Sequence, residues 1–197
     1  MIVYIGGVSG VGKTTIIESV EKLAMANNLK IERATVKEIL CDLAGVKTVE
    51  EYRCLPEEIR SSLHSEATNR IYEIDCINSK TVRLYDGHFC SLNPYNGNEI
   101  VRPIRFDDRK HLVAIIVLIA NPEVIFRRRI FDFNMRKDRH IVDVDFITRE
   151  QQREIEVAQI YERNINIPLY ILKNEGNISE INNEIFNLIK DIIKKET

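Results

Sequence analysis

The sequence predicts an α/β domain in which a parallel β-sheet is covered by helices on both faces. Two observations predict it. Short apolar runs rich in β-branched residues alternate with longer segments of helical periodicity along the 197 residues. A glycine-rich stretch also joins the first apolar run directly to the first helical segment. Because crossovers between parallel strands are right-handed, ligands are expected at the carboxyl ends of the strands, where this stretch lies.

The periodicity places each element in turn. Strands are expected at 2–5, 31–36, 81–85, 114–120 and 168–172. Longer helices are expected at 14–26, 37–44, 56–78, 123–131, 148–164 and 178–195. Gly45 is a natural C-terminal stop, Thr48 an N-cap for a short helix, and Pro56 suits a first helical turn. The segment 86–109 shows neither period and is expected to be a polar insert.

The composition disfavours nucleic-acid and membrane partners. The formal net charge is −2, so no global field attracts the chain to either surface. Hydrophobic residues make up 44% and charged residues 29%, as in ordinary globular proteins. The longest apolar run, 112–120, is far too short to span a membrane. The four cysteines lack the spacing of a metal site. We therefore expect a single cytoplasmic domain, residues 1–197, with reduced thiols.

The glycine-rich stretch matches the phosphate-binding pattern G-x-x-x-x-G-K-[ST] at every position: Gly7, Val8, Ser9, Gly10, Val11, Gly12, Lys13 and Thr14. Glycines let the backbone wrap a phosphate with its N–H groups turned inward, and the following helix adds the positive end of its dipole. Lys13 is expected to bridge the β- and γ-phosphates of ATP, and Thr14 to give its hydroxyl to Mg²⁺. ATP and Mg²⁺ are thus the expected cofactors.

A second metal ligand is expected at Asp86, where the strand 81–85 ends. A carboxylate at this position would reach Mg²⁺ through water. The alternative is that Asp86 and Gly87 form an ordinary turn. His88 is expected to orient the acceptor or Asp86, with a packing role as its alternative, because a monophosphate acceptor is already ionised and needs no base.

Arginines are concentrated between residues 127 and 153, where seven occur in a net acidic chain. Planar guanidinium groups suit phosphate oxygens and the charge of a transferring phosphoryl group. We interpret this segment as a mobile lid that closes over ATP and excludes water. The alternative is a solvated charged face, and Arg127 with one of its two neighbours is expected to pair with acids on the helix surface.

The acceptor is expected opposite the phosphate loop, in the helical segment between the second and third strands. Thr35, Arg53 and the segment 86–94 are the polar candidates there. Arg53 lies among apolar neighbours at a helix end, where a substrate phosphate would satisfy it. A structural ion pair with Glu57 or Glu58 is the alternative.

Together these residues resemble the archaeal type of adenylate kinase, loosely from residue 1 to about 190. The matching positions are the phosphate loop continued by Thr15, then Arg53, Asp86 and His88 in a D-x-H phrase, Arg128 and Arg129, Arg136, Arg139, Arg153, and Asn174 after Lys173. The resemblance implies direct in-line transfer of the γ-phosphoryl of Mg·ATP to AMP, giving two ADP. It implies that the adenine of ATP lies beside Asn174, and that the groups acting on the phosphoryl are Lys13, Arg128, Arg136, Arg139 and Arg153. It implies that the acceptor side includes Thr35, Arg53, Asp86 and His88.

The resemblance also implies the three-layer fold of P-loop nucleoside monophosphate kinases, with strand order 2-3-1-4-5. An acceptor-binding arm at about 35–78, a small lid at about 131–147 and a homo-oligomer, often a trimer, belong to that expectation. Ala34, Arg83 and the insert 86–109 depart from the family pattern, so another nucleoside monophosphate stays open as acceptor. Two other functions also stay open: a P-loop kinase of a small non-nucleotide alcohol, and a regulatory P-loop ATPase or assembly factor.

Overall fold

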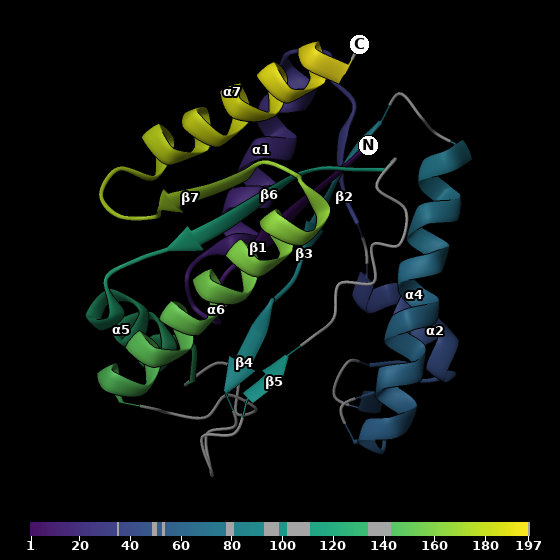
Figure 1. Ribbon diagram of the computed structural model, residues 1–197, viewed down its shortest axis with the longest axis vertical. Coiled ribbons are helices and arrows are strands. Elements are labelled where there is room, and N and C mark those ends of the chain that lie inside the picture. Colours follow the sequence, from purple (N-terminus) through teal and green to yellow (C-terminus); the bar gives the residue numbers. More distant parts are fainter. Residues whose placement is uncertain are drawn as a thin grey trace.

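Five parallel strands form the central sheet, in the order β2-β3-β1-β6-β7 (Figure 1). The computed structural model describes residues 1–34, 36–48, 51–52, 54–77, 81–92, 99–101, 111–133 and 143–196. The sheet strands are β1 (Ile2–Gly6), β2 (Ile31–Arg33), β3 (Val82–Asp86), β6 (Leu112–Ile119) and β7 (Leu169–Lys173). Counted along the chain, this order is the predicted 2-3-1-4-5, so the predicted fold class is confirmed.

The central strands are those whose side chains are apolar on both faces. Every residue of β1 is buried, and β6 is buried at all but two positions. Such strands suit the middle of a parallel sheet, since helices cover both of its faces. The edge strand β2 is shorter than the predicted 31–36. It ends at Arg33, and Val36 already begins the helix α2.

Helices cover the sheet on both faces, as Figure 1 shows. On one face, α1 (Lys13–Ala26) and α7 (Ile178–Glu196) enclose a core that includes Val3, Ile16 and Ile185. On the other face, α6 (Val144–Ile165) and α4 (Glu57–Ile77) pack against the sheet. The helix α2 (Val36–Ala44) lies along α4, and α5 (Pro122–Phe133) follows β6.

The helices on either side of the predicted lid extend further than the sequence indicated. The helix α5 continues to Phe133. The helix α6 already begins at Val144, because the carboxylate of Asp143 accepts a hydrogen bond of 2.6 Å from the N–H of Phe146 and so caps its first turn. An N-cap of this kind starts a helix one turn before the apolar pattern becomes clear. Residues 131–133 and 144–147 of the predicted lid are thus helical, and its residues 134–142 lie outside the described part of the chain.

The segment 86–109 contains a hairpin that sequence reasoning missed. Strands β4 (Cys90–Leu92) and β5 (Glu99–Val101) pair antiparallel, with Ser91 opposite Ile100. Figure 1 shows the hairpin beside α6, which it contacts through β4. Three-residue strands are too short to give a clear period of two, so the pattern alone did not indicate them.

Smaller expectations about the chain also have outcomes. Gly45 follows α2 with a φ of 66°, and the hydroxyl of Thr48 accepts a hydrogen bond from the N–H of Glu51, as a helix stop and an N-cap should. Among the cysteines whose side chains the structure describes, Cys41, Cys54 and Cys90, none forms a disulfide. In the described ranges, no helix has both the length and the apolar character needed to cross a membrane.

Candidate active site

The phosphate loop joins the carboxyl end of β1 to the first turn of α1, as predicted. Its glycines have the positive φ values that side chains resist: 138° at Gly7, 84° at Gly10 and 100° at Gly12. Space also excludes a side chain at Gly12, because a Cβ atom there would lie 2.4 Å from the amide nitrogen of Asn174. The loop sequence is thus dictated by backbone conformation and by close packing.

Four side chains hold the backbone carbonyl oxygens of this loop: Lys13 of the loop itself, and Arg128, Arg129 and Asn174 from elements far along the chain. Lys13 Nζ donates to the carbonyl oxygens of Gly7 and, at 3.3 Å, of Val8. Arg129 Nε on α5 donates to that of Ser9 at 2.8 Å. The carbonyl oxygen of Val11 accepts two hydrogen bonds, from Asn174 Nδ2 at 2.6 Å and Arg128 Nη1 at 3.1 Å. The conformation of the loop is therefore fixed by α5 and by the segment after β7.

Lys13 is buried, with 8% of its surface exposed. Burial lowers the pKa of Lys13 below its ordinary value, and the negative charges of Asp86, Glu154 and Glu150 oppose this effect. A buried ammonium group at the base of a phosphate loop loses part of its hydration, so its attraction to a phosphate oxygen is stronger than it would be at the surface.

Thr14 and Asp86 meet at the mouth of the loop, where the sequence predicted a metal site. The Thr14 hydroxyl lies 3.4 Å from Asp86 Oδ2, and Arg33 Nη2 lies 3.1 Å from the same oxygen. Two oxygens in neighbouring positions around Mg²⁺ are separated by about 3 Å. Mg²⁺ commonly takes one or two protein oxygens together with substrate phosphates and water. The two oxygens therefore fit a Mg²⁺ ion that a bound nucleotide would complete.

The segment after β3 is shaped by contacts with β1 and does not form the alternative Asp-Gly turn. A Cβ atom on Gly87 would lie 2.0 Å from the hydroxyl oxygen of Tyr4, and that hydroxyl donates to the carbonyl oxygen of His88 at 3.0 Å. The imidazole of His88 is about one-third exposed, with Nδ1 4.0 Å from a carboxylate oxygen of Glu154. Gly87 is therefore required by the close approach of Tyr4.

The described arginines of 127–153 differ in their surroundings. Arg127 pairs with Glu123 across 3.7 Å on the exposed side of α5, and Arg129 forms a buried ion pair of 2.7 Å with Glu150. The pair of Arg127 agrees with the expectation of ion pairs on the helix surface, whereas Arg129 pairs with a buried acid of another helix, α6. Arg128 instead lies beside the phosphate loop, where Nη2 also donates to the carbonyl oxygen of Asn174 at 3.3 Å.

Arg153, expected to act on the γ-phosphate, forms an ion pair of 2.8 Å with Glu156 on its own helix α6. Four other predicted site residues lie outside the described part of the chain: Thr35, Arg53, Arg136 and Arg139. The described half of the site is therefore the phosphate loop, the end of β3, and the groups that hold them.

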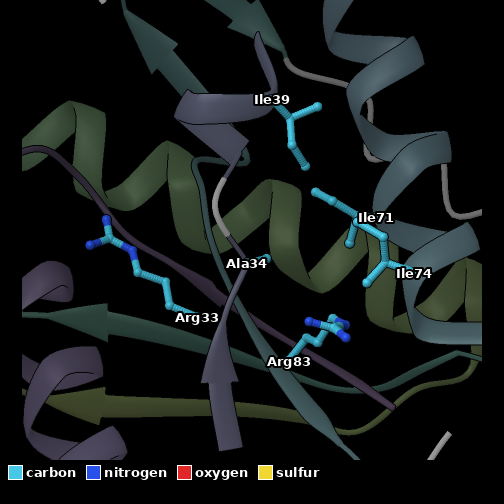
Figure 2. Close-up of a pocket in the computed structure, with 6 residues that line it drawn as sticks. All are labelled: Arg33, Ala34, Ile39, Ile71, Ile74 and Arg83. Atoms are coloured by element: carbon cyan, nitrogen blue, oxygen red, sulfur yellow. The ribbon is translucent and has the colours of Figure 1, made fainter. Parts of the chain in front are cut away.

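A small pocket lies between β2, β3 and the helices α2 and α4, in the region where the acceptor was predicted. Its lining is Arg33, Ala34, Ile39, Ile71, Ile74 and Arg83 (Figure 2). In Figure 2 the guanidinium of Arg83 points toward the isoleucines of α4, whereas that of Arg33 points away from them. Arg83 is buried and pairs with Glu32 across 3.3 Å. The unexpected arginine of a central strand thus lines this pocket.

Sequence reasoning missed three residues of this region: Arg33, Glu150 and Glu154. A signal for the two glutamates was available, because Glu150 and Glu154 lie on the same helical face as the buried Ile147, Val157 and Ala158. Acids on the apolar face of a helix are expected to accept hydrogen bonds or form ion pairs inside the protein, since a buried carboxylate needs such partners. Arg33 had no comparable signal in the sequence.

The sheet order, the loop between β1 and α1, and the facing Thr14 and Asp86 define a P-loop kinase fold. The chain belongs to the AAA domain family, whose family model matches residues 6–159. That span runs from the last residue of β1 through most of α6, and it includes the phosphate loop and Asp86. No curated protein matches the sequence significantly.

Solved structures agree with the fold. The shikimate kinase from Aquifex aeolicus superposes with a TM-score of 0.58 at 18% sequence identity, covering 96% of each chain. The shikimate kinase from Acinetobacter baumannii, solved in complex with shikimate, gives a TM-score of 0.56 at 14% identity, covering 96% of this chain and 93% of the other. At such identities the likeness concerns the fold and leaves the acceptor open.

Proposed function

We propose that the protein is an ATP-dependent nucleoside monophosphate kinase, with AMP as the first acceptor to test. The observation that supports this most is the 3.4 Å approach of the Thr14 hydroxyl to the Asp86 carboxylate at the mouth of the phosphate loop. Two candidate metal ligands, one from the first turn of α1 and one from the end of β3, would thus lie where the terminal phosphates of ATP are expected.

The donor half of the proposal is based on the phosphate loop. Lys13 would bind the β- and γ-phosphates, Thr14 and Asp86 would hold Mg²⁺, and the loop N–H groups with the N-terminus of α1 would bind phosphate oxygens. When bound, Mg²⁺ would neutralise charge on the phosphates. Arg128 and Asn174, which meet at the carbonyl oxygen of Val11, would border the adenine of ATP.

The acceptor half is supported mainly by Arg33. The pocket in Figure 2 has a volume of only about 30 Å³, so it would have to widen to admit a base between the isoleucines of α2 and α4. The guanidinium of Arg33 lies beside Asp86, within reach of a phosphate that approaches the γ-phosphoryl group. Arg53 and Thr35 remain proposed acceptor ligands on the same side.

Transfer in such a site depends on position and positive charge. A monophosphate oxygen is already ionised, so it attacks the γ-phosphorus without a base, and ADP leaves from the opposite side. Lys13 would stabilise the charge that spreads over the transferring group. The lid arginines Arg136 and Arg139, with Arg153 of α6, would add to this charge on closure and exclude water.

A coupled assay with Mg·ATP and each nucleoside monophosphate tests the proposal. ADP should form with AMP, or with one other monophosphate, and a bisubstrate dinucleoside polyphosphate should inhibit. Hydrolysis of ATP with no preference for any monophosphate would contradict the proposal and favour a regulatory ATPase.

A kinase of a small alcohol is the second candidate, and Asp86 is the observation that favours it. An alcohol must lose a proton during transfer, and the carboxylate of Asp86 stands at the mouth of the phosphate loop, where it would accept that proton. The solved structures of this fold include shikimate kinases. On this alternative, Asp86→Asn would lower kcat even at saturating Mg²⁺. On the leading proposal it would mainly weaken Mg²⁺ binding.

A further inference from the structure

Glu154 connects the phosphate loop to the acceptor side through three backbone groups. It reaches from α6 into the protein, where its surface is 0% exposed. One carboxylate oxygen accepts from the N–H of Gly7 at 2.8 Å, and the other from the N–H of Cys90 at 2.6 Å. The N–H of Phe89 lies between the two oxygens, at 3.0 and 2.9 Å.

These bonds begin where the hydrogen bonding of the sheet ends. Strands β1 and β3 pair up to Ile5 and Asp86, and the N–H of Gly87 still donates to the carbonyl oxygen of Ile5 at 3.1 Å. Beyond that point the two chains separate into the phosphate loop and the segment 88–90. Glu154 lies in this fork and takes the place of the missing strand-to-strand bonds.

A carboxylate suits this position better than any other side chain of its size. All three N–H groups need acceptors, and an ionised carboxylate is acceptor only. An apolar residue would leave three buried N–H groups unpaired, and each would keep the cost of its lost hydration. A glutamine would turn an NH₂ group toward one of them. Burial raises the pKa of Glu154, and the N–H groups of Cys90, Phe89 and Gly7 with the charge of Lys13 oppose that rise.

We propose that Glu154 is a positioning residue that fixes the phosphate loop relative to the acceptor-side segment 86–90. The segment includes Asp86, which faces Thr14, and His88. In-line transfer requires donor and acceptor groups at a fixed separation, and a displacement of 1 Å costs on the order of 10²-fold in rate. Glu154 bonds to the backbone of both segments, and its charge also acts on Lys13. Its bonds set the separation of the two segments, so we expect the loss of reach to affect the transfer step more than the binding of either substrate.

The kinetic test of this role rests on the proposed function. Glu154→Gln is expected to lower kcat by about 10- to 100-fold, with the KM for Mg·ATP within about threefold of wild type. Glu154→Asp keeps the charge but is too short to reach both segments, and should show the same loss. Glu162→Gln, the same change further along α6, is the control and should leave kcat unchanged. Wild-type kcat in Glu154→Gln would overturn the proposal, and full activity in Glu154→Asp would assign the effect to charge alone.

A second test needs no acceptor and separates this inference from the proposed function. Amide hydrogen exchange is measured with and without Mg·ADP in wild type and in Glu154→Gln. In wild type the nucleotide should slow exchange both in the phosphate loop and at Phe89 and Cys90. In the variant the slowing should be confined to the loop. Equal protection of Phe89 and Cys90 in both proteins would refute the role of Glu154, whatever reaction the enzyme performs.

Discussion

The hydroxyl of Tyr4 fills the space that a side chain at Gly87 would occupy. The two residues belong to neighbouring strand ends, and the same hydroxyl donates to the carbonyl oxygen of His88. Tyr4 also stacks on Tyr85, with ring centroids 5.0 Å apart. The buried Tyr4 of β1 therefore fixes the position of the backbone that follows β3, and this position requires a glycine at residue 87.

Gly87→Ala should therefore destabilise the protein, by about 1–3 kcal/mol as for other overpacked positions. The new Cβ atom would be 2.0 Å from the Tyr4 hydroxyl oxygen and 2.5 Å from the ring carbon that carries it. Urea denaturation measures the change. Adding Tyr4→Phe should recover part of the loss, since it removes the closer atom. Gly45→Ala is the control. Nothing lies within 4 Å of its Cβ position, so its loss of stability should come only from the positive φ of residue 45. An equal loss in both glycine variants would contradict the packing argument.

Thr14 and Asp86 should act as a pair toward Mg²⁺. Thr14→Val removes the hydroxyl while preserving shape, and Asp86→Asn removes the charge; each should raise the Mg²⁺ concentration needed for half-maximal activity at least tenfold. Because both act on one ion, the double variant should lose less than the product of the single losses. Thr14→Ser keeps the hydroxyl and should retain the wild-type Mg²⁺ requirement. Titration of activity against Mg²⁺ gives all four values, and independent, multiplicative losses would argue against a shared ion.

Lys13→Met should abolish ATP-dependent activity and yet stabilise the protein without ligand. The folded pKa of Lys13 is lowered from its ordinary 10.5 by burial, so the unfolded chain binds the proton more tightly than the folded one. The charged lysine therefore destabilises the fold below its lowered pKa, and this cost disappears as pH rises toward 10.5. Thermal midpoints at pH 7 should be higher in the variant, by about 2–4 °C per kcal/mol relieved.

The advantage of Lys13→Met should shrink as the pH is raised toward 10.5, because wild type then loses the proton as well. Lys22→Met on the exposed side of α1 is the matched control and should show no such pH dependence. A lower midpoint in Lys13→Met at neutral pH would show that the hydrogen bonds of Lys13 to the loop outweigh its burial.

Breaking the ion pair between Arg129 and Glu150 should destabilise the protein strongly. Either Arg129→Met or Glu150→Met leaves a buried charge unpaired, at about 3–5 kcal/mol, whereas the double variant should lose clearly less than the sum. Arg127→Met is the control on the same helix, because its side chain is 77% exposed and its pair with Glu123 should contribute about 0–1 kcal/mol. Denaturant unfolding measures each value, and a loss in Arg127→Met as large as in Arg129→Met would contradict this assignment.

The phosphate loop and the sheet could be predicted from sequence because their causes are local. A loop with glycines at three positive-φ positions can adopt few other backbone conformations. The strand β6 is so apolar that only a position in the middle of a sheet would bury it. The approach of Thr14 to Asp86 was also predictable, since Thr14 follows the phosphate loop after β1 and Asp86 ends the neighbouring strand β3. Their role in binding Mg²⁺ stays a prediction. The strand order itself came from the family resemblance.

The remaining features depend on contacts between residues far apart in the chain. Glu154 bonds to Gly7, 147 residues away, and no local pattern indicates that partner. The place of Arg33 beside Asp86 depends on the register of β2 against β3. The strands β4 and β5 are too short for their period to be visible. The roles of Arg53, Arg136 and Arg139 remain predictions, because those residues lie outside the described part of the chain.

The donors on the carbonyl oxygens of Ser9 and Val11 come from α5 and from the end of β7. A loop held in this way loses its conformational entropy when the protein folds, before any nucleotide arrives. Nucleotide phosphates would then dock on a rigid surface and would not have to order it. For this part of the site, association should be fast, and its calorimetric signature should include only a small change in heat capacity.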